Sequence, residues 1–230
     1  MKPLILAWPG NLDRAESLAT RLDAEVGKMT VRRFPDGESY LRIDTPVDGR
    51  AVALVGSLDR PDEKVLPLLF LAATAKDLGA ARVGLIAPYL AYMRQDRRFQ
   101  PGEGISSIYF ARLLSGFFDW LVTVDPHLHR RQSLSEIYSI PTSVVHAAPL
   151  ISEWIRANIE SPVLIGPDAE SAQWVSEVAK GADARIWLAA SWLIFQARLE
   201  EIDLLQRLPA YRKYIQEVPR FVPRFWRRRR

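Results

Sequence analysis

Short apolar runs alternate with segments of helical periodicity along most of the chain, and this alternation limits the possible folds more than any other feature. Each run spans four to six residues and is bounded by Gly, Pro or polar residues, as is typical of strands buried in a parallel sheet. The clearest runs are 4–7, 51–56, 83–87, 120–124 and 162–166. Strands that alternate with helices favour right-handed crossovers. The sequence therefore predicts an α/β fold with mostly parallel sheets.

Turn and cap residues divide the chain further. Pro35-Asp36-Gly37 is strong turn chemistry and predicts a hairpin or flap between two short β segments. We place a domain boundary near His146, which divides the chain into residues 1–145 and 146–230. A short strand is expected at Val144–Val145, and Asn11 or Asp13 can cap the first helix. Helices are expected over five segments: residues 12–22, Pro61 to about Leu78, Ile105 to about Phe117, near Leu150–Ile155, and a last one that ends at about Lys180.

Charge is distributed unevenly. The net charge is +4 over 230 residues, but Gln206–Arg230 alone carries nine Lys/Arg and one Glu, so the remaining residues sum to −4. A basic nucleic-acid footprint is therefore not expected on the body of the protein. The chain has no cysteine, the uncharged run 186–195 is too short to span a bilayer, and no secretory leader is recognisable near Met1. We expect a cytoplasmic protein.

Three arginines follow the apolar run 83–87, in the pentapeptide Arg94-Gln95-Asp96-Arg97-Arg98. Ligands of open α/β sheets bind just beyond the carboxyl ends of the strands. Guanidinium groups offer fixed donors that match phosphate oxygens, so this loop suits a polyanion. The competing interpretation is a solvated surface loop whose charges partly cancel.

Two other strand ends carry polar residues, Asp125-Pro126-His127 and Asp168. Phosphoryl chemistry needs cations to spread charge, and a carboxylate or imidazole to hold Mg²⁺. The sequence has no Gly-Lys-Ser/Thr phosphate loop and no G-x-G-x-x-G after a strand, so side chains would hold the phosphates. A structural histidine and a helix-capping aspartate are the plainer alternatives for His127 and Asp168.

These pieces, in this order, resemble the ribose-phosphate pyrophosphokinase (phosphoribosyl pyrophosphate synthetase) family over residues 1 to about 182. The matching segments are 33–38, 88–98, 105–107, 125–127 and 166–169. The resemblance implies two similar α/β domains of phosphoribosyltransferase type, the second incomplete in this chain. It also implies Mg²⁺ as cofactor, ATP and ribose 5-phosphate as substrates, and a homo-oligomer. The implied reaction is pyrophosphate transfer from Mg-ATP to ribose 5-phosphate, with AMP leaving.

The resemblance also implies roles for particular residues. Arg94 and His127 are expected in catalysis, and His127 and Asp168 at Mg²⁺. The hairpin is expected to reach the adenine of a neighbouring subunit's ATP. The residues implied in ATP binding are Arg94, Gln95, Asp96 and Arg97 from the strand-end loop, and Phe34, Asp36 and Glu38 from the hairpin.

Two departures from the family pattern stand out. Glu170 and Ser171 occupy positions where the family usually has glycines, and nothing after Gly181 matches the family's Thr-Gly-Gly-Thr turn, which holds the sugar phosphate, or its mobile loop with catalytic Lys and Arg. The tail admits four interpretations: a frameshifted or truncated reading, a helical replacement docked on the second sheet, a basic arm for RNA or acidic lipid, and a solvated terminus. For function, the alternatives are a non-catalytic regulatory subunit associated with a complete synthetase, and a phosphoribosyltransferase.

Overall fold

The computed structural model describes residues 2–166 and 172–188, together with 202, 204, 205, 207 and 211. The chain divides into two compact units, Met1–Ala147 and Ala148–Arg230. The predicted site residue Asp168, the neighbouring Glu170 and Ser171, and most of the basic tail lie outside the described residues.

The first unit is built on a six-stranded sheet in which every neighbouring pair is parallel. The strand order is β2-β1-β5-β6-β7-β8, so the chain starts one strand from an edge, steps to that edge and then moves steadily to the other. All strands consequently end at one edge of the sheet. Their bounds are β1 Leu4–Ala7, β2 Glu25–Gly27, β5 Ala51–Val55, β6 Arg82–Ala87, β7 Trp120–Val124 and β8 Thr142–Val145.

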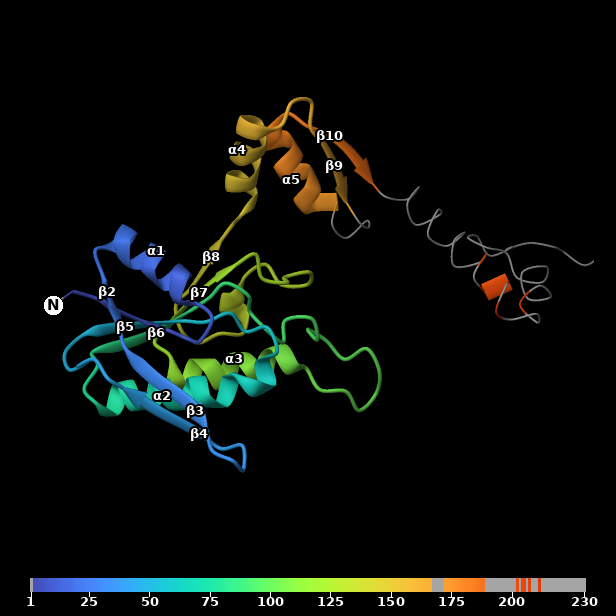
Figure 1. The fold of residues 1–230 in the computed structure, drawn as a ribbon. Coiled ribbons are helices and arrows are strands. Elements are labelled where there is room, and N and C mark those ends of the chain that lie inside the picture. Colours follow the sequence, from blue (N-terminus) through green and yellow to red (C-terminus); the bar gives the residue numbers. More distant parts are fainter. Residues whose placement is uncertain are drawn as a thin grey trace, which may run out of the picture. The chain divides into compact units, whose positions relative to one another are not determined.

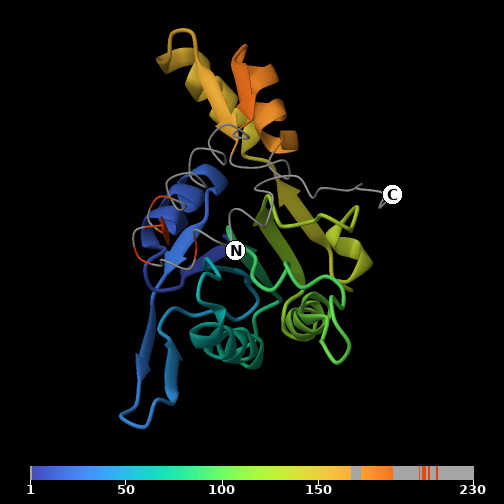
Figure 2. The same ribbon diagram turned by 90° about the vertical axis from the view of Figure 1, so that its right-hand side faces the viewer.

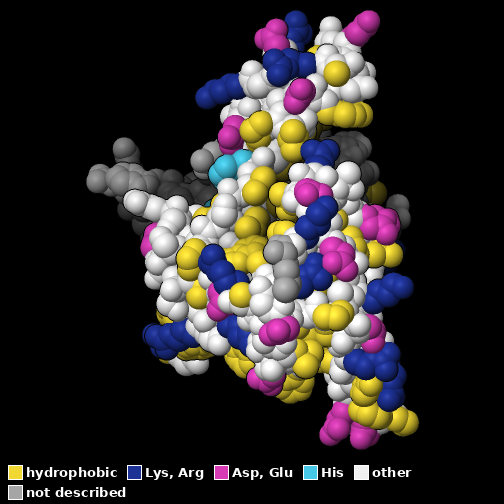
Figure 3. Space-filling view, turned by 90° about the vertical axis from the view of Figure 1, so that its left-hand side faces the viewer, with side chains coloured by type: hydrophobic (Ala, Val, Ile, Leu, Met, Phe, Trp, Pro, Cys, Tyr) yellow, Lys and Arg dark blue, Asp and Glu magenta, His cyan; other side chains and the backbone are white. Residues whose placement is uncertain are grey.

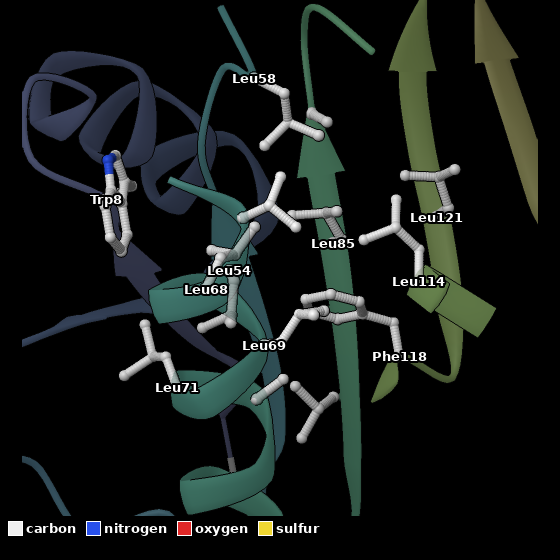
Figure 4. Close-up of a cluster of buried hydrophobic side chains, with 14 of the residues drawn as sticks. Trp8, Leu54, Leu58, Leu68, Leu69, Leu71, Leu85, Leu114, Phe118 and Leu121 are labelled. Atoms are coloured by element: carbon white, nitrogen blue, oxygen red, sulfur yellow. The ribbon is translucent and has the colours of Figure 1, made fainter. Parts of the chain in front are cut away.

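Helices cover both faces of this sheet (Figures 1 and 2). Helix α1 (Leu12–Leu22) lies on one face, and α2 (Val65–Asp77) and α3 (Ser106–Phe117) lie together on the other. Strand alternation explains the arrangement: Leu4 and Leu6 belong to the core under α2 and α3, whereas Ile5 packs with the buried alanines of α1. Figure 4 shows the larger core, where Leu54, Leu85 and Leu121 from three strands meet Leu68, Leu114 and Phe118.

One glycine allows the middle of the sheet to pack closely. A Cβ at Gly84 would collide with the ring of Trp120 on the neighbouring strand, which is paired with it residue for residue. Any other residue in β6 at this point would displace the indole from the sheet surface.

A two-stranded antiparallel hairpin projects from the first unit. It consists of β3 (Met29–Arg33) and β4 (Ser39–Ile43), and Gly37 in its turn has φ +93°. This confirms the turn predicted from Pro35-Asp36-Gly37, because glycine adopts positive φ at little cost. In the space-filling view, acidic side chains lie at the hairpin's tip, with basic and hydrophobic ones behind it (Figure 3).

The second unit contains α4 (Ala148–Asn158), β9 (Val163–Gly166), α5 (Ala172–Ala182) and β10 (Arg185–Leu188). Strands β9 and β10 are parallel and joined through α5. Ser152 ties the two helices together, because its hydroxyl donates to the carbonyls of Ala148 and Val178. Among the described residues, the second unit has a small buried core of Ala148, Ile155, Val178 and Ala182.

The predicted α/β class with mostly parallel sheets is confirmed, but several local expectations were wrong. The helix expected from Pro61 begins as a 3-10 turn, Pro61–Glu63, and becomes α-helical only at Val65. The apolar positions of the helix predicted over residues 12–22 include Leu12 and Leu22 at its two ends, but both side chains are exposed. Strands β2 and β10 were not predicted; both are short, and β2 contains one apolar side chain. Both segments are strands because a neighbouring strand pairs with them, and not because of the residues they contain.

Candidate functional site at the carboxyl ends of β6 and β7

The polar strand ends of the first unit lie at the edge where all strands of the sheet finish. After β6 the chain turns through Tyr92, whose φ is +59°. The Tyr92 ring packs against Phe110 of α3 with 4.8 Å between centroids, and its hydroxyl donates to Asp62. This hydrogen bond raises the pKa of Tyr92 above its usual value. A left-handed tyrosine persists only where its surroundings fix it, so the loop leaves the strand in a defined direction.

The four predicted ATP-binding residues of this loop differ in their surroundings. Arg94 and Arg97 are exposed, Gln95 is half-buried and Asp96 is buried. Gln95 is tied to the start of α3, because its Oε1 accepts a hydrogen bond from Ser106 and its carbonyl accepts one from the Ser107 amide. Arg94 is thus an exposed cation next to a fixed residue, within reach of a ligand at the strand end.

Asp96 forms an internal ion pair. Its side chain is 3% exposed and receives the Arg130 Nη1 at 3.0 Å and 3.1 Å from its two oxygens. The neighbouring Arg131 donates from Nη2 to the Asp96 carbonyl and to the Ser107 hydroxyl, each at 3.2 Å. Arg130 and Arg131 of the loop after β7 therefore hold the loop after β6 through these hydrogen bonds.

The remainder of the loop is closed on itself by Glu103. Its carboxylate accepts hydrogen bonds from the backbone amides of Phe99 (2.7 Å) and Gln100 (3.1 Å), and its carbonyl accepts one from Arg98 Nε. The Phe99 ring lies under two guanidinium groups, 4.9 Å from Arg97 and 5.6 Å from Arg130. Arg97 and Arg130 are thereby held beside the same ring, and guanidinium groups are the side chains best suited to phosphate oxygens.

At the end of β7, Asp125 has φ +39° and both of its carboxylate oxygens are engaged. One is 2.9 Å from His146 Nδ1, and the other accepts the Ala147 amide at 3.0 Å. The rings of His127 and His129 form an edge-to-face pair with 4.0 Å between centroids. The predicted catalytic and metal residue His127 therefore lies in the loop that also contains Arg130 and Arg131.

The hairpin residues make mostly local contacts. Asp36 Oδ1 accepts the amide of Glu38 at 3.1 Å across the turn. Phe34 is 39% exposed and packs edge-to-face on Tyr40, and the Arg32 guanidinium lies over both rings, at 4.7 Å and 4.2 Å. All three predicted hairpin residues are thus accessible to a further molecule.

Magnesium ligands are sparse in the described part of the first unit. No group of three or more carboxylate or imidazole side chains suited to a metal ion occurs among the described residues. Asp125, the carboxylate nearest to His127 in sequence, has both oxygens occupied by protein donors. Since Mg²⁺ requires several oxygen ligands in near-octahedral geometry, the described side chains do not make a complete site for it.

An apolar hollow of about 480 Å³ lies beside α1, on the carboxyl-end side of β5 to β8, and Pro88 after β6 also lines it. Its floor comes from valines and Ile86 of β5 to β8, and Asp13, Arg14 and Ser17 of α1 are its polar lining. None of the predicted site residues lines it.

Reasoning from sequence missed Arg130, Arg131, Glu103 and Ser106 as residues that shape the site. The available signal was the Arg130-Arg131 pair just after a strand-end His-x-His segment. Its partner could not be identified, because Asp96 lies 34 residues earlier and its burial depends on tertiary packing.

Comparison with known proteins identifies relatives for much of the chain. Residues 4–117 match the family described as the N-terminal domain of ribose phosphate pyrophosphokinase. The ribose-phosphate pyrophosphokinase of Methanobrevibacter smithii is 32% identical over 182 residues, 78% of this chain and 60% of that protein. That of Methanothermobacter thermautotrophicus is 38% identical over 178 residues, 76% of this chain and 61% of that protein. The chain thus spans about three fifths of the length of these relatives.

A solved structure supports the same fold. The phosphoribosylpyrophosphate synthetase of Mycobacterium smegmatis superposes with a TM-score of 0.71 at 24% identity, covering 82% of this chain and 64% of that one. Among the described residues of this chain, no helix is both long and apolar enough to cross a membrane.

Proposed function

The chain belongs, through residues 4–117, to the ribose phosphate pyrophosphokinase family, and we propose that it binds ATP where its β6 and β7 strands end and serves pyrophosphoryl transfer to ribose 5-phosphate. One observation carries the proposal: the exposed Arg94 lies in the same loop as Arg97, and Arg130 from the loop after β7 packs on Phe99 and pairs with Asp96 of that loop. Such a surface matches the triphosphate of ATP better than it matches a neutral ligand.

In the proposed reaction the anomeric hydroxyl of ribose 5-phosphate attacks the β-phosphorus of ATP. The bond between the β-phosphorus and the oxygen bridging to the α-phosphate breaks, AMP leaves with that oxygen, and the hydroxyl proton passes to solvent or a nearby base. Arg94 and Arg97 would bind phosphate oxygens, and Gln95 would fix their orientation. Catalysis of this kind consists mainly of positioning and charge stabilisation.

Magnesium would enter the site on the phosphates of ATP and neutralise part of their charge. By the family pattern, His127 would hold the ion directly or through water, and the same role falls to Asp168, which lies outside the described residues. The family pattern and the position of His127 in the loop after β7 support this assignment.

The hairpin is proposed to act on a second subunit of a cytoplasmic homo-oligomer. Phe34, Asp36 and Glu38 would contact the adenine of the neighbour's ATP. Their exposure and the stacked Arg32, Phe34 and Tyr40 side chains support this role, because a partly exposed aromatic on a projecting hairpin favours a contact with another molecule.

Sugar-dependent turnover by this 230-residue chain is expected to be very slow. Residues after Gly181 contain no Thr-Gly-Gly-Thr turn that could hold the phosphate of the sugar, and an unheld acceptor forfeits orientation worth several kcal/mol (roughly up to 7–11 in the best cases). The alternative is a non-catalytic subunit that binds ATP and regulates a complete synthetase.

The test measures Mg-ATP binding by calorimetry and AMP release with and without ribose 5-phosphate, on purified chain verified by mass. We expect binding with almost no sugar-dependent AMP, which would favour the regulatory assignment for this chain. Robust sugar-dependent AMP would instead establish the enzyme and contradict the expected defect. Absence of ATP binding would overturn the proposal.

A further inference from the structure

The contact between the two strand-end loops has properties that an ordinary surface ion pair lacks. The Asp96 side chain is 3% exposed, whereas that of Arg130 is 45% exposed. A buried carboxylate is costly unless hydrogen bonds and an opposite charge compensate it. Arg130 provides both, since one nitrogen reaches both oxygens of Asp96. The burial of Asp96 therefore depends on a residue from the other loop.

Arg131 adds a second connection of a different kind. It reaches the backbone carbonyl of Asp96 and the buried Ser107 at the start of α3, so it fixes main chain instead of a charged side chain. Together, the adjacent arginines hold the side chain, the carbonyl and the following helix. Residues 94 and 95 immediately precede this fixed point, and Gln95 is itself bonded to Ser106 and Ser107.

From this arrangement we propose that Arg130 and Arg131 are positioning residues for nucleotide binding and that Asp96 is the residue they hold, and not a direct ligand of ATP. The inference rests on the proposed function, because it concerns the same ATP site. Arg94 gains affinity by being ordered before the nucleotide arrives, since a loop that is ordered beforehand does not pay that entropy on binding. Arg130 and Arg131 also hold the loop that contains His127 in a fixed position relative to the loop that contains Arg94.

The first experiment measures Mg-ATP affinity by calorimetry on the full chain and on Arg130→Ala, Arg131→Ala and Asp96→Asn. Each variant is expected to bind about tenfold more weakly, with Arg130→Lys intermediate because it keeps the charge. The double variant Asp96→Asn/Arg130→Ala should lose no more than the weaker-binding single variant, since both remove one interaction. Arg112→Ala, on the exposed side of α3, is the matched control and should bind as wild type.

A direct phosphate contact would give a different pattern. If Arg130 or Asp96 touched ATP independently, the losses in the double variant would add, and the positioning role would be overturned. Unchanged affinity in all three single variants would also overturn it.

The second experiment needs no nucleotide and separates this inference from the proposed function. Amide hydrogen exchange of the free chain is compared over residues 94–104 and over the hairpin 29–43. Arg130→Ala and Asp96→Asn should speed exchange in the loop severalfold and leave the hairpin unchanged, with a cooperative thermal transition retained. If the loop of both variants exchanged its amides at the wild-type rate, the inference would be refuted even if ATP binds. Faster exchange in the loop of a chain that never binds ATP would overturn the proposed function while supporting the grip on the loop.

Discussion

The loop after β6 and the β3–β4 hairpin both contain residues proposed to contact ATP, but they are held in opposite ways. The loop is fixed by another strand-end loop, by α3 and by its own Glu103. At the hairpin's tip, Asp36 and Phe34 contact residues of the hairpin itself, and Arg33 at the end of β3 reaches the Glu63 carbonyl. The carboxylates show the contrast: Asp96 is buried against an arginine from elsewhere in the chain, whereas Asp36 is exposed and bonds the amide two residues along.

This difference separates two ways of building a binding site. The loop is ordered when the chain folds, so little further conformational entropy is lost when its side chains bind a ligand within their own subunit. The hairpin presents aromatic and acidic groups that have little to contact in their own unit, which suits a role completed by a second molecule. The four predictions below test this contrast, from the largest expected effect to the smallest.

Arg94→Ala should weaken Mg-ATP binding by about ten- to hundredfold, because a charge-assisted hydrogen bond contributes roughly 1.5–3 kcal/mol. Its guanidinium is exposed, so the melting temperature should hardly change. Calorimetric titration and thermal unfolding measure the two quantities. Wild-type affinity in the variant would remove Arg94 from the site and leave the loop without its proposed role.

Tyr92→Phe should lower the free energy of unfolding by about 1 kcal/mol, since it removes the hydrogen bond to Asp62 at the point where the loop begins. That bond raises the pKa of Tyr92 in the folded state, so its stabilisation is present below the unfolded pKa of about 10 and is lost as pH rises through the folded value. Denaturant unfolding at pH about 8 and about 11.5 should show the gap between wild type and variant closing at the higher pH. A gap independent of pH would contradict this account.

Phe34→Ala should cost about 1 kcal/mol or less in stability, because a partly exposed ring loses only its contacts with Tyr40 and Arg32. Its effect on ATP should appear only in the associated protein. A dilution series, followed by light scattering and nucleotide titration, compares the variant with wild type. Undiminished ATP affinity in a wild-type monomer would show that the hairpin does not serve a neighbouring subunit.

Asp36→Ala should change the free energy of unfolding by no more than about 0.5 kcal/mol, because an exposed turn residue away from the core rarely contributes more. The matched variant Asp96→Ala should cost clearly more, since it leaves Arg130 without its buried partner. Urea denaturation of both variants measures the difference. Similar values would erase the contrast between the two regions.

Several features could be predicted from residues alone, and the structure confirms them. The apolar runs fixed the parallel strands β1, β5, β6, β7 and β9, since a short apolar segment bounded by turn residues has few other stable placements. Pro35-Asp36-Gly37 specified the hairpin because its turn requires positive φ at Gly37. The order of motifs also identified the family, whose domain matches residues 4–117.

Tertiary structure alone decided which polar residues meet. Asp96 and Arg130 are 34 residues apart, and no local pattern marks Asp96, in a run of charged residues, as buried. Short β2 became a strand because β1 offered it a parallel partner. Strand periodicity is a local property that a sequence records directly, whereas the neighbours of a charged side chain depend on how distant loops converge when the sheet forms.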